Sequence, residues 1–123
     1  MSLFWIRNVL WAFLEQPDEL DELEDALGIA SRHAVGCLEI QAPVANPALH
    51  QLRLDMAIEA EDEETAVNSA NRLAKSIAAT ACAIAGGSPR SIGVSRSFMA
   101  EFPSALSARV GFLHQRDLAR NRR

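Results

Sequence analysis

The sequence predicts an α+β fold: two N-terminal helices, a ββαβ unit with an antiparallel sheet covered on one face by a helix, and a C-terminal helix. Three observations support it. The N-terminal segment is almost wholly apolar, the middle of the chain alternates with period two, and a long apolar stripe with helical spacing follows. We expect a single domain over 1–123, divided into a helical N-terminal extension (1–30), a ββαβ core (34–99) and a C-terminal helix with a basic tail (104–123).

Residues 3–14 form the apolar N-terminal segment, in which only Arg7 and Asn8 are polar. We expect a helix here, apolar around nearly its whole circumference. A helix of this length rises only about 18 Å, which is too short to cross a bilayer. It either packs within its own domain or docks onto a second subunit or another partner. In the second case the partner-binding residues are the aromatic ones, namely Phe4, Trp5, Trp11 and Phe13.

A second helix is expected after Pro17, with Asp18 as its N-cap and Gly28 as its end. Leucines spaced three and four residues apart give it an apolar stripe, and its remaining face is acidic. The stripe is Leu20, Leu23 and Leu27, and the acidic face is Asp21, Glu22, Glu24 and Asp25. Such a face is typical of a solvated helix; the alternative is a docking surface for a basic partner.

Period-two alternation over residues 34–42 and 52–60 predicts two antiparallel strands, joined by a long loop at 43–51 that contains two prolines. Alternation places the polar side chains of both strands on one sheet face: Glu39, Gln41, Arg53, Asp55 and Glu59. An acid–base pair could be drawn from these carboxylates. We do not favour it, because the sequence places no His, Cys or Tyr to work beside them.

The longest helix is expected between an N-cap at Asp62 and a C-cap at Gly86, and alternation from Ile92 to Phe98 then predicts a third strand. The Gly-, Ser- and Arg-containing stretch between them could cradle an anion. However, it leaves a helix C-terminus, where the helix dipole disfavours anions, so we interpret it as a cap followed by an edge strand. The second sheet face and at least one edge stay uncovered, and a second copy could cover them.

Charge is distributed unevenly along the chain: the net charge is −4, but residues 1–64 carry −11 and residues 65–123 carry +7. Unless the two halves interleave in the fold, this polarity favours association with a second copy or another charged surface. A C-terminal helix is expected from Ser104, ending in a basic tail. Its possible anion or nucleic-acid contacts are Arg109, Arg116, Arg120, Arg122 and Arg123.

The sequence contains no specific catalytic, metal or cofactor motif, so none of these sites is expected. Cys37 and Cys82 lack the spacing and the histidine companions of a metal site. No signal peptide is evident, and we expect a cytoplasmic protein.

We therefore expect a non-enzymatic, self-associating protein that serves as an assembly, adaptor or structural component through protein–protein interaction. It would use the N-terminal aromatic helix and an uncovered sheet face or edge. One alternative is a nucleic-acid-associated regulator that uses the Arg-rich C-terminus. The other is a small dimeric α+β enzyme or ligand-binding protein with a cavity between sheet and helix, beside Glu39 and Asp55.

Overall fold

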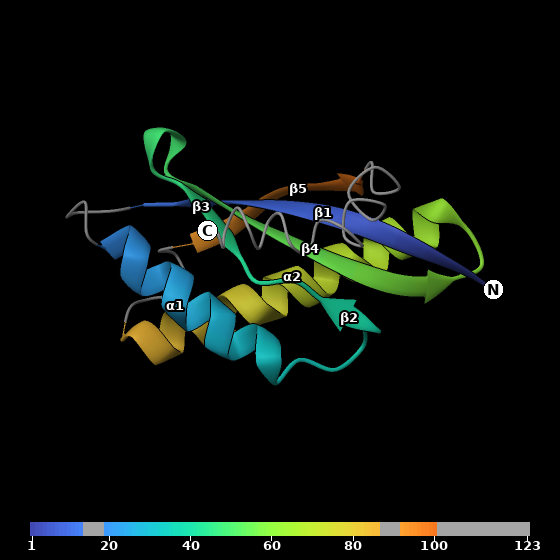
Figure 1. Cartoon of the computed structure of the whole chain (residues 1–123), viewed down its shortest axis with the longest axis horizontal. Coiled ribbons are helices and arrows are strands. Elements are labelled where there is room, and N and C mark those ends of the chain that lie inside the picture. The colour runs from blue at the N-terminus through green and yellow to red at the C-terminus, as the bar shows by residue number, and fades with distance from the viewer. Residues whose placement is uncertain (14–18, 87–91, 101–123) are drawn as a thin grey trace, which may run out of the picture.

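A five-stranded antiparallel sheet carries two helices on one of its sides in the computed structural model, which describes residues 1–13, 19–86 and 92–100 (Figure 1). The elements in chain order are β1 (Ser2–Ala12), α1 (Glu19–Arg32), β2 (Glu39–Ile40), β3 (Val44–Asn46), a 3₁₀ turn (Pro47–Leu49), β4 (Gln51–Ala60), α2 (Glu63–Ala85) and β5 (Ile92–Met99). The strand order is β2-β4-β1-β5, and β3 also pairs with β4. With β2 and β3 taken as one interrupted edge strand, this is a βαββαβ arrangement.

The predicted α+β class and antiparallel sheet are confirmed, but the prediction of two N-terminal helices is wrong. Residues 3–12 of the apolar segment form most of β1, which lies between β4 and β5 and pairs with both. A strand buried on both faces shows no polar alternation, so a short apolar run fits a buried strand and a buried helix equally well. Half of its positions are Phe, Trp, Ile or Val, residues that favour strands.

The expected second helix is α1, and its three stripe leucines are all buried. The helix does not stop at Gly28, however, but continues to Arg32. Gly28 does not have the positive φ that is typical of a glycine at the end of a helix. The proposed N-cap, Asp18, lies outside the described residues.

The strand expected over 34–42 is reduced to the two residues of β2, and part of the expected loop forms β3 and the 3₁₀ turn. Beyond this point the predictions hold: β4, α2 and β5 lie where the sequence places them. The Asp62 carboxylate accepts a hydrogen bond from the Thr65 backbone N–H at 2.8 Å, and Gly86 ends α2 with a φ of 81°. The expected C-terminal helix, 104–123, lies outside the described residues.

The two faces of the sheet differ in what they carry. Even-numbered side chains of β1 and β4 pack against α1 and α2 and form the core, in which Ile6, Leu10, Leu54 and Met56 are fully buried. Odd-numbered side chains lie on the opposite side, which we call the outer face. No helix of the described ranges is both long and apolar enough to cross a membrane.

Candidate functional site

Strand register determines which side chains meet on the outer face. Between β1 and β4, Arg7 lies opposite Asp55 and Val9 lies opposite Arg53. On the other side of β1, Arg96 of β5 also lies opposite Val9. The predicted grouping of Glu39, Arg53, Asp55 and Glu59 on one face follows from this register. Gln41 falls beyond β2 and continues the pairing only through its backbone N–H, which donates to the Asp55 carbonyl at 2.9 Å.

Arg7 and Asp55 form the central ion pair of the outer face. The Arg7 Nε donates to Oδ1 of Asp55 at 3.1 Å, and its Nη2 donates to Oδ2 at 3.0 Å. The Asp55 side chain is only 5% exposed, against 29% for Arg7. A buried carboxylate needs such a partner, because an unpaired charge in this environment is strongly unfavourable. Arg7 therefore already engages both oxygens of the Asp55 carboxylate.

Arg53 is the second cation at this position, with its Nε 3.9 Å from Oδ2 of Asp55. That contact is an ion pair without a hydrogen bond. Burial lowers the pKa of the Arg53 guanidinium, and the charge of Arg7 lowers it further, while Asp55 acts in the opposite direction. One carboxylate thus serves two guanidinium groups, which leaves this part of the outer face with a net positive charge.

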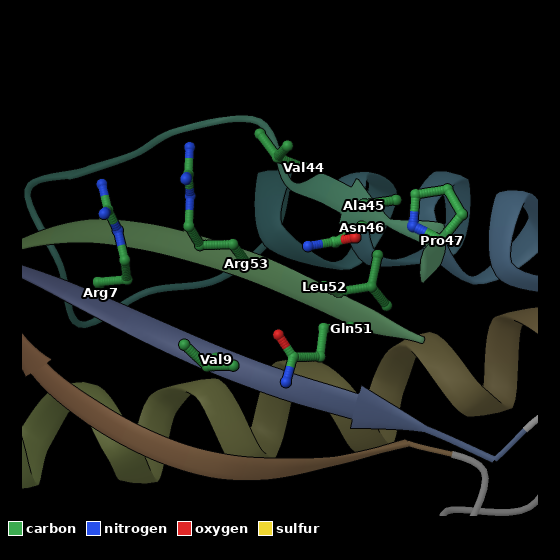
Figure 2. A pocket seen from close by; sticks show the side chains of 9 residues that line it. All are labelled: Arg7, Val9, Val44, Ala45, Asn46, Pro47, Gln51, Leu52 and Arg53. Atoms are coloured by element: carbon green, nitrogen blue, oxygen red, sulfur yellow. The ribbon is translucent and has the colours of Figure 1, made fainter. Parts of the chain in front are cut away.

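A pocket of about 410 Å³ opens beside these arginines. Its lining residues come from β1, β3, the 3₁₀ turn and β4: Arg7, Val9, Val44, Ala45, Asn46, Pro47, Gln51, Leu52 and Arg53. Figure 2 shows the Arg7 and Arg53 side chains pointing away from the sheet in the same direction, side by side. The pocket has the size and the mixed apolar and polar lining of a small-molecule site.

This pocket differs from the cavity that the sequence suggested. The expected position was between sheet and helix, beside Glu39 and Asp55, but the side chains there are fully buried core residues such as Leu54 and Met56. The observed pocket lies on the outer face, and neither Glu39 nor Asp55 lines it. Sequence reasoning missed Arg7 as a site residue because it assigned that residue to a helix. A lone arginine within an apolar strand was the available signal.

Trp11 and Phe13 form a second feature of the outer face, which we call the aromatic corner. Their ring centroids lie 4.5 Å apart at an angle of 59°. The Trp11 ring lies over Gly93 of β5, so closely that a Cβ on Gly93 would be 2.8 Å from the Trp11 Cζ2. Phe13 remains 67% exposed. The glycine therefore makes room for the indole, and the indole supports an exposed phenyl ring.

The other two predicted partner-binding aromatics lie apart from this corner. Phe4 packs against the core on the helix side of the sheet, and Trp5 is buried with Ala57 and Ala100. The five C-terminal arginines proposed as anion or nucleic-acid contacts lie outside the described residues. Within the described ranges, Arg96 lies over the Phe98 ring, with its guanidinium carbon 4.9 Å from the ring centroid.

No group of three or more His, Cys, Asp or Glu side chains able to hold a metal ion occurs within the described ranges. Cys82 is buried and Cys37 is partly buried, and burial raises the pKa of the Cys37 thiol. No protein-family model matches the chain, and no curated protein or solved structure matches it significantly. The site must therefore be interpreted from its own geometry.

Proposed function

We propose that this is a non-enzymatic, self-associating protein whose outer face packs against the outer face of a second copy. The observation that supports this most directly is the aromatic corner. Phe13, just past the end of β1, and Leu3, near its start, are 67% and 52% exposed on the face that α1 and α2 do not cover. Exposed apolar groups on one face are typical of protein–protein contact surfaces.

The sheet edges are less suitable for self-association than the face. In β5, Arg96 pairs with Val9 but Val94 pairs with Leu10, so that Ser95 is an extra residue and the strand carries a bulge. Bulges twist an edge and prevent regular pairing with another strand. The opposite edge consists of β2 and β3, with only two and three residues. These edges favour a face-to-face arrangement over a continuous intermolecular sheet.

A second copy turned end for end is a suitable partner for this face. Such a two-fold arrangement places Leu3 of one copy against the aromatic corner of the other, and the same contact occurs twice because a two-fold interface is self-complementary. The Arg7–Asp55 ion pair lies between these two contacts along β1. The protein would then act as an assembly or adaptor component that functions as a dimer.

Light scattering over a range of protein concentrations tests this proposal, in low and in high salt. We expect twice the mass of the chain at high concentration in both salts, because apolar contacts resist screening. Phe13→Ser and Leu3→Ser should each weaken the dimer by about tenfold or more. Val35→Ser is the matched control, since Val35 is 83% exposed and contributes to a groove beside α1 and α2.

Two results would contradict the proposal. One is a monomer at every concentration in both salts. The other is a dimer that Val35→Ser weakens as much as Phe13→Ser does. Circular dichroism on each variant checks that the fold is retained.

A second candidate function is binding of single-stranded nucleic acid, supported by the proximity of cations and rings on the outer face. Arg96 stacks on Phe98, and the aromatic corner lies on the same face. Bases stack on such rings while guanidinium groups contact phosphates. Fluorescence anisotropy with labelled oligonucleotides tests this. If Arg96→Met weakens binding and deletion of residues 116–123 does not, the face is the site; the reverse would locate it in the tail.

A further inference from the structure

We infer that the pocket on the outer face binds a small organic anion, whose carboxylate or phosphate group is held between Arg7 and Arg53 while its apolar body lies against the pocket wall. The pocket lies on the same outer face as the contacts proposed for self-association, but those contacts use Leu3 and the aromatic corner. None of those residues lines the pocket.

The first argument is one of charge. If the only task of this cluster were to neutralise Asp55, Arg7 alone would suffice, because its Nε and Nη2 already bond both carboxylate oxygens. Arg53 adds a second positive charge within 3.9 Å of the same carboxylate. The two guanidinium groups repel each other in a partly buried site. An incoming anion would remove that repulsion, which is the condition for favourable anion binding.

The second argument concerns hydrogen-bond donors. Asp55 occupies one edge of the Arg7 guanidinium and leaves its Nη1 group without a partner among the described residues. Arg53 donates no hydrogen bond within the same described ranges. Guanidinium groups present planar sets of donors that match the oxygens of carboxylates and phosphates. Figure 2 shows the two side chains extending in parallel from the sheet, so both can reach one bound anion.

The third argument concerns the walls. Val9 and Val44 lie opposite Arg53 on the two neighbouring strands, so the arginine stands between two aliphatic side chains. Pro47 closes one end, and Asn46 and Gln51 add polar groups there. A volume of about 410 Å³ exceeds the space that an inorganic ion needs. An anion with an attached apolar body would use both the charge and the walls.

Isothermal titration calorimetry on the full chain tests this inference with four probes: phenyl phosphate, benzoate, inorganic phosphate and benzyl alcohol. The two organic anions separate a preference for phosphate from one for carboxylate. Inorganic phosphate lacks the apolar body and benzyl alcohol lacks the charge. We expect one or both organic anions to bind more tightly than inorganic phosphate, and no measurable binding of benzyl alcohol.

Variants locate the site. Arg53→Met keeps the aliphatic stem, removes no hydrogen bond among the described residues and should weaken binding by about tenfold or more. Val44→Asp places a carboxylate opposite Arg53 and should abolish binding with Arg53 still present. The matched control is Arg96→Met, which removes the same charge from the same face outside the pocket and should leave the affinity within about twofold.

Each other outcome overturns the inference. If neither organic anion binds at millimolar concentration, the pocket is not an anion site. Equal losses of anion affinity in Arg53→Met and Arg96→Met would mean that binding depends only on the overall charge of the protein. Binding of benzyl alcohol as tight as that of the anions means an apolar site. The same titrations in Phe13→Ser separate this inference from self-association. That variant keeps every residue that lines the pocket, so it should bind the anion at least as tightly as the wild type whether or not the protein forms a dimer.

Discussion

The side-chain oxygen of Asn8, fully buried in β1, accepts a hydrogen bond from the hydroxyl of Ser97 in β5. Asn71 of α2 donates to the same hydroxyl oxygen at 3.0 Å, and the Asn8 amide donates to the Leu54 carbonyl of β4 at 2.9 Å. This network joins three strands and a helix within an otherwise apolar core. Because its bonds form only in one alignment, it specifies the register of β1 against both neighbours.

Ser97→Ala removes the hydroxyl that connects Asn8 to Asn71 and leaves the buried Asn8 oxygen without this donor. We expect the free energy of unfolding to fall by about 1–3 kcal/mol, the cost of an unsatisfied buried polar group. Urea denaturation measures it. Ser95→Ala is the control, because Ser95 is exposed at the bulge. Equal effects of the two substitutions would show that the network contributes nothing.

Gly93→Ala should disturb the aromatic corner, because the added Cβ would lie 2.8 Å from the Trp11 ring and 3.1 Å from its next nearest ring atom. Overpacking of this kind costs about 1–3 kcal/mol, and the displaced indole should change its fluorescence. Gly28→Ala is the contrasting control. Its Cβ would meet only Pro43 at 3.9 Å, and alanine in a helix should stabilise the fold by about 0.5–1 kcal/mol. Stabilisation by Gly93→Ala would contradict the described ring position.

Glu24 gives the fold a predictable pH dependence. Burial raises its pKa above the ordinary value of 4.5, the negative charges of Asp21 and Asp25 raise it further, and a hydrogen bond from the Ala45 backbone N–H opposes them. Folding therefore favours the protonated carboxyl. The stabilisation that the protonated Glu24 carboxyl adds to the free energy of unfolding is complete below pH 4.5. It is lost as the pH rises through the raised pKa of this group.

Glu24→Gln should consequently raise the thermal midpoint at pH 7, because an amide oxygen can still accept from the Ala45 N–H at 3.1 Å without carrying charge. Glu24→Ala should lower the midpoint, since the bond between α1 and β3 is lost. Thermal scans of both variants between pH 4 and pH 8 provide the measurement. A larger stabilisation by Glu24→Gln at pH 4 than at pH 7 would contradict a raised pKa for the Glu24 carboxyl.

Asp55→Asn should be strongly destabilising, because it leaves two guanidinium groups without their shared counter-charge. We expect a loss of about 2 kcal/mol or more in the free energy of unfolding. The double variant Arg7→Met with Asp55→Leu removes both members of the pair and should cost less than Asp55→Asn alone. Chemical denaturation of the two variants makes the comparison, and the opposite order would mean that the pair itself supplies net stability.

The sequence predicted those parts of the fold in which apolar and polar side chains recur at regular spacing. In β4 and α2 the apolar side chains recur with a clear period, because polar side chains fill most of the positions between them. β1 lacks this signal, since Ile6 and Leu10 face the helices while Trp5 is buried on the outer face. The candidate site was harder to predict. The Arg7–Asp55 pair depends on register, and register could not be derived once β1 was taken for a helix.

The central position of β1 also affects the order in which the chain can fold. Its contacts with β4 span 48 residues at the Arg7–Asp55 pair, and those with β5 span 89 residues between Asn8 and Ser97. During synthesis this aromatic strand emerges well before either neighbour, and it stays unpaired on one side until β5 has left the ribosome. High contact order of this kind slows folding and prolongs the exposure of apolar segments. The nascent chain therefore exposes an unpaired aromatic strand for longer than a chain whose strands pair locally.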